Sequence, residues 1–205
     1  NDLFLAAMSE VAMKRGEASR TRILEIARDT LATQGLEGFV MREIAKRAVM
    51  QLGNLQYYFP TRGDLLEAVI RTEFEHNLAT IRSLSEKATS LKDYINQLSD
   101  ILLQEYTGIG GNIWPVLTLL HLHNRRYRQL SEEIYQRHFD TLVDAMRRFG
   151  ISGSTAALSE KARLITAIID GAALQVHAGP HSRKKESWQS WCRQIGQTAV
   201  AIAER

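Results

Sequence analysis

Residues 41–60 read MREIAKRAVMQLGNLQYYFP, and this stretch decides the fold of the chain. Its apolar side chains recur at helical spacing in two short segments, which predicts helices over residues 41–48 and 51–57. A tight turn around Val49 joins them, and Pro60 ends the second because proline cannot continue a helix. Two short helices joined in this way are typical of a helix-turn-helix, whose second helix lies in the DNA major groove.

The helical pattern continues on both sides of this stretch. Apolar residues spaced four apart predict a helix over residues 18–34, which ends at Gly35. On the other side, Thr61 is placed to cap a helix that runs to residue 84, with Asp64 in its favourable first turn. The residues that share the apolar face of the first helix are Ile23, Ala27 and Leu31.

The rest of the chain is also helical in pattern, and no run alternates as a strand would. We therefore predict an all-α fold of about nine helices. An N-terminal three-helix helix-turn-helix DNA-binding domain, residues 14–62, precedes a larger C-terminal helical domain for ligand binding and dimerisation, residues 63–205. No fold is assigned to residues 1–13. The remaining helices are predicted at residues 91–107, 112–123, 125–149, 155–178 and 185–204.

Composition and charge agree with a cytoplasmic protein that binds nucleic acid. The 205 residues carry a net charge of only +3, but residues 14–62 hold nine Lys or Arg and five Asp or Glu, a local excess of +4. DNA phosphates require such positive charge. The single cysteine, Cys192, excludes an internal disulfide framework and suits a reducing compartment. The apolar runs are too short and interrupted to span a bilayer, so we expect no membrane partner.

The second short helix offers side chains suited to reading DNA bases. Gln51, Asn54 and Gln56 are expected on its exposed face, and amide groups bond base edges in pairs, adenine most favourably. Gly53 lets the backbone approach closely. Short helices with polar surfaces also occur in proteins that never touch DNA, and Tyr57 could equally be a packing aromatic. The groups suited to phosphate oxygens are Arg42, Lys46, Tyr57, Tyr58 and Arg62.

At these positions the sequence resembles the tetracycline-repressor (TetR) family. Order and spacing agree throughout residues 21–70, and Asp170-Gly171 near the C-terminus is similar to that family's pattern. The resemblance implies a homodimer that binds a palindromic operator, usually as a repressor. It also implies that a small molecule bound in the C-terminal domain releases the homodimer from the DNA. The matching residues are Arg42-Glu43-Ile44-Ala45, Ala48, Gly53-Asn54-Leu55-Gln56-Tyr57-Tyr58-Phe59-Pro60, Arg62 and Leu65-Leu66.

The resemblance also assigns roles, and it shows three departures. Val40 and Gln51 stand where a capping Thr and a Ser are usual, and Val49 stands where the turn usually has Gly. A lost cap costs about 1 kcal/mol, and Val in a left-handed turn is strained. We expect these changes to affect operator affinity and turn geometry, not the fold. The positions implied to meet bases are Arg42, Leu52, Gly53, Asn54 and Gln56, and those implied to meet phosphates are Val40, Tyr58 and Arg62.

The last two helices are predicted to form a dimer interface. The helix over residues 155–178 is apolar on two faces, and a helix of this kind must be covered on both sides. Pairing with a second copy in a four-helix arrangement would cover it, and an operator with two half-sites needs two copies. Alternatively, these two helices only complete the apolar core of a single chain. The predicted interface residues are Ile165, Ile169, Ala172, Val176, Trp188, Trp191, Ile195, Ala199 and Ile202.

The middle helices offer candidates for an effector pocket, although core packing is the alternative role for each residue alone. We expect no cofactor and no metal: His121 and His123 are two apart, so they point apart on a helix. Cys192 lies in an apolar stripe and is expected to be a buried, inert thiol. The candidate pocket residues are Tyr106, Trp114, Leu117, His121, Asn124, Gln175 and His177.

Two rival functions remain open. One is an architectural or division-control DNA-binding protein of the same fold, which binds without an effector and would have a helical core packed shut. The other is an enzyme that has lost DNA binding, supported only by the three departures at Val40, Val49 and Gln51. No nucleophile, base and orienting residue are grouped as catalysis requires, so we expect no enzyme.

Overall fold

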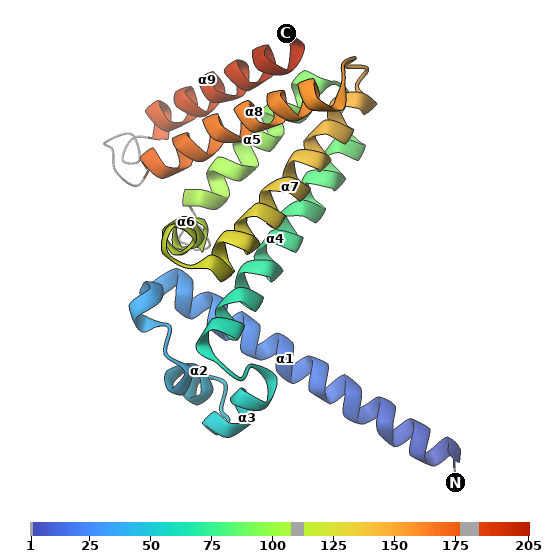
Figure 1. Cartoon of the computed structure of the whole chain (residues 1–205), viewed down its shortest axis with the longest axis vertical. Helices are drawn as coiled ribbons and strands as arrows, with labels where there is room; N and C mark the ends of the chain where they lie inside the picture. Colours follow the sequence, from blue (N-terminus) through green and yellow to red (C-terminus); the bar gives the residue numbers. More distant parts are fainter. Residues whose placement is uncertain (1, 108–112, 177–184) are drawn as a thin grey trace. The chain divides into compact units, whose positions relative to one another are not determined.

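The computed structural model describes residues 2–107, 113–176 and 185–205, with side chains over 15–104, 113–175 and 188–205. Within these residues every regular element is a helix, which confirms the all-α prediction (Figure 1). The chain divides into two compact units, Asn1–Thr72 and Glu73–Arg205. The helices of the described residues are α1 (Asp2–Gly38), α2 (Met41–Arg47), α3 (Leu52–Tyr58), α4 (Arg62–Lys87), α5 (Leu91–Thr107), α6 (Ile113–His123), α7 (Arg125–Arg148), α8 (Thr155–Val176) and α9 (Lys185–Glu204).

The first helix differs most from its predicted bounds. It begins at Asp2, whereas the sequence analysis began it at residue 18 and gave residues 1–13 no fold. The stretch contains no proline and only one glycine, Gly16, so little in it interrupts a helix. The predicted end is where the helical geometry does break, because Gly35 has φ 66° and ψ −165° within α1. Glycine adopts this left-handed conformation without steric cost.

The core of the first unit fixes α2 and α3 through a few apolar side chains. Ile44 and Leu55 are fully buried, and Phe39 closes the core beside them. Arg47 on α2 pairs with Asp29 on α1 and also bonds the buried Thr30. These contacts orient both short helices, so their remaining faces point to solvent.

The start of α4 matches its prediction. The Asp64 backbone N–H donates to Thr61 Oγ1 at 3.1 Å, and the Thr61 backbone N–H donates to Asp64 Oδ2 at 3.0 Å. This reciprocal pair is a capping box, which satisfies backbone donors at the helix start. The prediction that Thr61 caps this helix, with Asp64 in its first turn, is confirmed.

The second unit is a bundle of helices around one main apolar core. In Figure 1, α5, α8 and α9 lie together, and each pair among them is in contact. Helix α7 packs against α6 and α8, and also follows the C-terminal part of α4, where Arg137 pairs with Glu75. Gly196 marks the closest approach of α9 to α5, because an added Cβ would lie 2.7 Å from Asn96 Oδ1. Among the described residues, no helix is long and apolar enough to cross a membrane.

Candidate nucleic-acid interface and ligand cavity

Helix α3 is held by one face and presents the others to solvent. Leu55 is fully buried and Phe59, which follows the helix, is 3% exposed. By contrast, Asn54 and Gln56 are exposed, and Tyr57 is 83% exposed. Leu55 therefore anchors a short helix, and the exposed side chains of Asn54 and Gln56 flank this anchor on its two sides.

The structure brings the predicted DNA-contacting residues onto the helix-turn-helix, and their role in DNA binding stays a prediction. Leu52 and Tyr58 are half-buried, which limits their reach. Tyr57 meets Tyr58 edge-on with ring centroids 5.3 Å apart, but its high exposure makes it a poor packing residue. The predicted residues that are exposed are Val40, Arg42, Lys46, Gln51, Gly53, Asn54, Gln56, Tyr57 and Arg62.

The three departures have the local geometry that their residue types predict. Val40 and Gln51 are the N-caps of α2 and α3, and neither side chain makes a capping hydrogen bond. Val49 has φ 56°, the left-handed region in which a β-branched residue is strained. Its side chain is 81% exposed, so little packing compensates for the strain. The turn is held instead by its backbone, because the Val49 N–H donates to the Lys46 carbonyl and the Met50 N–H donates to the Ala45 carbonyl, both at 3.0 Å.

Arg62 has an intramolecular role that the sequence did not indicate. Its Nε donates to the Phe39 carbonyl at 2.8 Å and its Nη2 donates to the Leu36 carbonyl at 2.6 Å. The guanidinium also lies 5.7 Å from the centroid of the Phe39 ring. The first residue of α4 thus holds the segment between α1 and α2, and its contact with phosphate stays a prediction.

Sequence reasoning also missed Arg20, which places a second cation near the end of α3. Its guanidinium carbon lies 5.1 Å from the centroid of the Phe59 ring, and the side chain is exposed. The only signal in the sequence was the local excess of positive charge over residues 14–62, which does not say where a single arginine lies.

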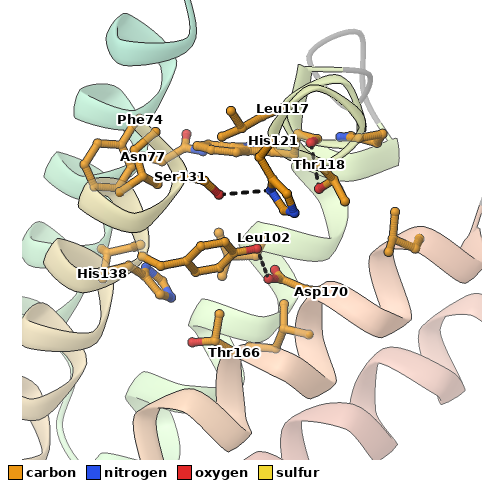
Figure 2. A pocket seen from close by; sticks show the side chains of 17 residues that line it. Phe74, Asn77, Leu102, Leu117, Thr118, His121, Ser131, His138, Thr166 and Asp170 are labelled. Carbon is orange, nitrogen blue, oxygen red and sulfur yellow. Dashed lines mark hydrogen bonds between the residues drawn. The ribbon is translucent and has the colours of Figure 1, made fainter. Parts of the chain in front are cut away.

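The second unit encloses a cavity of about 150 Å³ between α4, α5, α6, α7 and α8 (Figure 2). Most of its surface is apolar or aromatic, as is usual for a small-molecule site. Polar side chains reach it from four of the five helices. The lining residues are Phe74, Asn77, Ile81, Leu102, Trp114, Pro115, Leu117, Thr118, His121, Ser131, Ile134, Tyr135, His138, Thr166, Ile169, Asp170 and Leu174.

Two pairs of polar side chains in the cavity lining bond each other, and Figure 2 draws these bonds as dashed lines. The Tyr135 hydroxyl donates to Asp170 Oδ2 at 2.8 Å, and Ser131 Oγ lies 3.2 Å from His121 Nδ1. Burial raises the pKa of Tyr135, and the negative charge of Asp170 raises this pKa further, so the phenol stays protonated. Burial lowers the pKa of His138 to about 4, which keeps its imidazole neutral at pH 7.

Three of the seven predicted pocket residues line this cavity, namely Trp114, Leu117 and His121. Asn124 does not: it is exposed and caps α7, where its Oδ1 accepts from the Arg126 backbone N–H at 2.9 Å. Gln175 is exposed and also lies off the lining. The side chain of Tyr106 and the whole of His177 lie outside the described residues.

A wider hollow of about 550 Å³ adjoins the cavity between α7 and α8. It has its own charged residues, Arg128, Glu132 and Arg163. The two spaces share part of their lining, so the same side chains face both. The residues shared by both are His121, Ser131, Tyr135, Thr166 and Asp170.

The predicted dimer residues fall into two groups, and their role stays a prediction. The core of the single chain already covers four of them, each at most 3% exposed: Ile165, Ile169, Ala172 and Ala199. Trp188, Trp191, Ile195 and Ile202 on α9 are only half-buried, and the side chain of Val176 lies outside the described residues. The apolar side chains that α8 leaves exposed are on its other face, where Leu164 and Leu174 are each 50% exposed.

Cys192 is buried on α9, as the sequence predicts. Burial, followed by the negative charge of Asp100, raises the pKa of its thiol to about 11. The thiol is therefore protonated at neutral pH and unreactive. Among the described residues, no group of three or more His, Cys, Asp or Glu could hold a metal ion.

Comparison with known sequences places the helix-turn-helix in a described family. Residues 23–69 match the family of bacterial regulatory proteins named tetR. An HTH-type transcriptional regulator from the 5′ region of dhlA in Xanthobacter autotrophicus is 29% identical over 187 residues, which cover 84% of this chain and 86% of that protein. The HTH-type transcriptional regulator PksA of Bacillus subtilis is 24% identical over 166 residues, covering 80% and 81%.

Solved structures share the fold over almost the whole chain. A TetR-family regulator from Mesorhizobium loti superposes with a TM-score of 0.73 at 13% identity, covering 93% of this chain and 95% of that one. A transcriptional regulator from Saccharomonospora viridis, solved in complex with choline, gives a TM-score of 0.72 at 20% identity, covering 92% and 97%. The fold of this chain is therefore one that these solved regulators share.

Proposed function

We propose that this chain, which belongs to the TetR family of DNA-binding transcriptional regulators, is a homodimeric repressor. That family consists of regulators and not of enzymes. In this proposal a small-molecule effector bound within the second unit releases it from a palindromic operator. The observation that carries the DNA-reading part is the exposure of two amide side chains of α3, Asn54 and Gln56, which flank the buried anchor Leu55.

The amide groups of these two side chains favour contacts with base edges over attraction to phosphates alone. An Asn or Gln side chain has one acceptor and two donors, and can bond both N6 and N7 of an adenine in the major groove. Arg42 and Lys46 are exposed on α2, the helix that contacts α3, and would supply charge for phosphate contacts that set the register. Loss of the N-caps at Val40 and Gln51 costs stability but leaves these side chains exposed.

A homodimer is supported by apolar surface that one chain leaves open. Leu164 and Leu174 are half-exposed on α8, and Trp188 and Trp191 on α9 are only partly covered. Apolar side chains gathered on two neighbouring helices are a feature of association surfaces. A two-fold pairing through α8 and α9 would present two α3 helices to the two halves of a palindrome.

Effector control is favoured by the cavity, since an architectural protein of the same fold needs no enclosed space. A relative of the same fold was solved with choline. We propose that an effector occupying the cavity prefers one arrangement of the two units over another. Such a preference would shift the separation of the paired α3 helices and lower DNA affinity.

Selection of binding sites from random duplex DNA by the purified chain tests this proposal. We expect an enriched palindrome, bound by two chains, with affinity that falls steeply as salt rises. Asn54→Ala should weaken binding to the selected duplex, and Asp144→Asn, an exposed change on α7, should not. No enrichment from a folded dimer, with or without small molecules that bind it, would contradict sequence-specific regulation.

A further inference from the structure

The cavity of the second unit offers mainly apolar contact to a ligand. The rings of Phe74 and Trp114 line it from α4 and α6, and Leu102 and Leu117 add aliphatic surface from α5 and α6. Transfer of apolar surface from water into such a space is favourable, and aromatic rings pack well against a flat ligand. The walls alone therefore select for a compact, largely apolar molecule.

Most polar side chains of the lining already bond the protein itself. The Tyr135 hydroxyl donates to Asp170, and Ser131 bonds His121. A ligand with many hydroxyls would have to break these bonds to form its own, so the lining disfavours a sugar-like molecule. Two further hydroxyls of the lining donate to backbone carbonyls of their own helices, those of Thr118 and Thr166.

His138 is the exception among the described residues of the lining. Its imidazole meets the Phe139 ring edge-on, with centroids 6.3 Å apart, but it makes no hydrogen bond within the described part of the chain, and Figure 2 draws none. The other polar side chains of the lining, Asn77 and Trp114 included, each have a partner in the protein.

The state of this imidazole makes it a suitable partner for one polar group. Burial lowers the pKa of His138 to about 4, so at pH 7 the ring is neutral and offers one N–H donor and one nitrogen acceptor. A polar group that is withdrawn from water without a partner costs free energy. A ligand group that bonds the ring would recover this cost, whereas a purely apolar ligand would not.

The carboxylate of Asp170 does not set the sign of a ligand's charge. It accepts from Tyr135, and the hollow that it also lines carries Arg128 and Arg163. The protein therefore supplies its own donor to this carboxylate, and its own positive groups face the same hollow. A neutral ligand leaves that arrangement as it is, whereas an ion would lose its hydration shell without gaining a charge reserved for it.

We propose that the cavity binds a compact, neutral and largely apolar molecule with one hydrogen-bonding group, which bonds the imidazole of His138 while the apolar part packs against Phe74 and Trp114. The proposal deepens the proposed function, on which it rests for the ligand's role as effector. The size of the space agrees with it, because an apolar cavity of about 150 Å³ accommodates a molecule of about the size of benzene.

Four small molecules test the preference for a neutral ligand with one polar group. Phenol is that ligand, toluene replaces its hydroxyl by a methyl group, N-methylpyridinium is a cation with the shape of toluene, and benzoate is an anion. In an apolar space without a polar partner, toluene would bind more tightly than phenol, because burying an unbonded hydroxyl costs free energy.

Titration calorimetry of the full chain at pH 7 measures the four affinities. We expect phenol to bind at least as tightly as toluene, and both ions to bind at least about tenfold more weakly than phenol. Tighter binding of toluene than of phenol, or binding of either ion as tight as that of phenol, would overturn the proposal. So would failure of phenol, benzyl alcohol and cyclohexanol all to bind at millimolar concentration.

A variant of His138 locates the hydrogen bond. His138→Phe keeps a ring but removes both nitrogens, so toluene should then bind about tenfold or more tighter than phenol. The matched control His76→Phe, at an exposed position on α4, should leave the order of the two ligands unchanged. If His138→Phe does not fold, as judged by circular dichroism, His138→Met carries the same expectation. Phenol that still binds as tightly as toluene in the folded variant would contradict the role of His138, and the ligand series in the wild type needs no variant.

A separate readout distinguishes this inference from the proposed function. The selected duplex is titrated with the chain at saturating phenol. Binding of phenol that lowers DNA affinity supports both statements. Binding of phenol with unchanged DNA affinity contradicts release by ligands of this class and leaves the site at His138 standing, whereas specific DNA binding by a chain that binds none of the neutral probes contradicts only that site.

Discussion

Helix α3 and the cavity of the second unit use polar side chains in opposite ways. On α3, one apolar residue, Leu55, faces inward, and the polar residues around it point to solvent. In the cavity the polar side chains point inward, where pairs such as Tyr135 and Asp170 bond each other. The first surface is ready for a large partner with its own polar edges. The second suits a small molecule that makes mostly apolar contacts and needs few hydrogen bonds.

The two regions also differ in whether a substitution affects folding or binding. A change on the inner side of α3 alters folding, and a change on its outer side alters recognition. In the cavity the two effects are less separable, because the same buried groups pack the helices and face the ligand.

The largest effect is expected from Leu55→Ala. Truncating a fully buried leucine costs about 2–5 kcal/mol, and Leu55 anchors a helix of only seven residues. Urea unfolding of the full chain should show a loss of stability in the transition of the first unit. Gln56→Ala, the next residue and exposed, should change stability by no more than about 0.5 kcal/mol. Similar losses for both would contradict the one-sided anchoring of α3.

Two exposed residues should separate base reading from phosphate attraction. Gln56→Ala should cost about 1–3 kcal/mol of affinity for the selected duplex and relax the preference at one base position. Lys46→Ala should weaken selected and unrelated duplexes alike, and lower the dependence of log affinity on log salt by about 1. Fluorescence anisotropy at four salt concentrations measures both. A uniform loss across duplexes for Gln56→Ala would assign it to phosphate.

Acid should destabilise the cavity region through His138. The pKa of this imidazole is about 4 in the folded chain, below its ordinary value of 6.5. The unfolded chain therefore binds the proton first as the pH falls, and the unfolding free energy should decrease by about 2 kcal/mol between pH 7 and pH 5. Among the described residues of the same lining, His121, Tyr135 and Asp170 are the other titratable groups.

Denaturation at pH 7 and pH 5 measures this term. His138→Gln, which cannot be protonated, should reduce the difference between the two pH values. His76→Gln, at an exposed position on α4, serves as the control and should leave the difference as it is. An equal pH dependence in wild type and His138→Gln would show that this histidine is not the cause.

The smallest effects are expected at the helix-turn-helix backbone. Val40→Thr places a hydroxyl at the N-cap of α2 and should stabilise the first unit by about 1 kcal/mol. Val49→Gly removes the left-handed strain at φ 56° but loosens the unfolded chain, so its gain should be smaller. Thermal unfolding of both variants is the measurement. A lower melting temperature for Val40→Thr would mean that Val40 makes packing contacts that a threonine loses.

Much of the fold could be predicted because its signals are local. Spacing of apolar residues located α2 to α9, and the pair Thr61 and Asp64 located the start of α4 correctly. The early start of α1 was missed because the sequence analysis assigned residues 1–13 no fold, although they contain no proline or glycine that would break a helix.

The two candidate sites differ in the same respect. The residues proposed to contact bases lie on one short helix, α3, so the sequence alone was enough to place Asn54 and Gln56 on that helix. The cavity draws residues from five helices, and spacing along one helix does not reveal which faces converge. Asn124 was assigned to the pocket for its polarity but caps α7. Arg62 bonds the carbonyls of Leu36 and Phe39, which spacing along the chain did not indicate, and its phosphate contact stays a prediction.

Two measurements on Asn54→Ala, its stability and its affinity for DNA, test most directly whether α3 contacts the bases. Asn54→Ala and wild type are compared for unfolding free energy, and for affinity to the selected duplex and to a scrambled duplex of equal length and composition. We predict unchanged stability, with a wild-type preference for the selected duplex of a thousandfold or more that the variant reduces by tenfold or more. Equal affinity of wild type for both duplexes, or an unaltered preference in Asn54→Ala, would contradict the account of α3 as the reading surface.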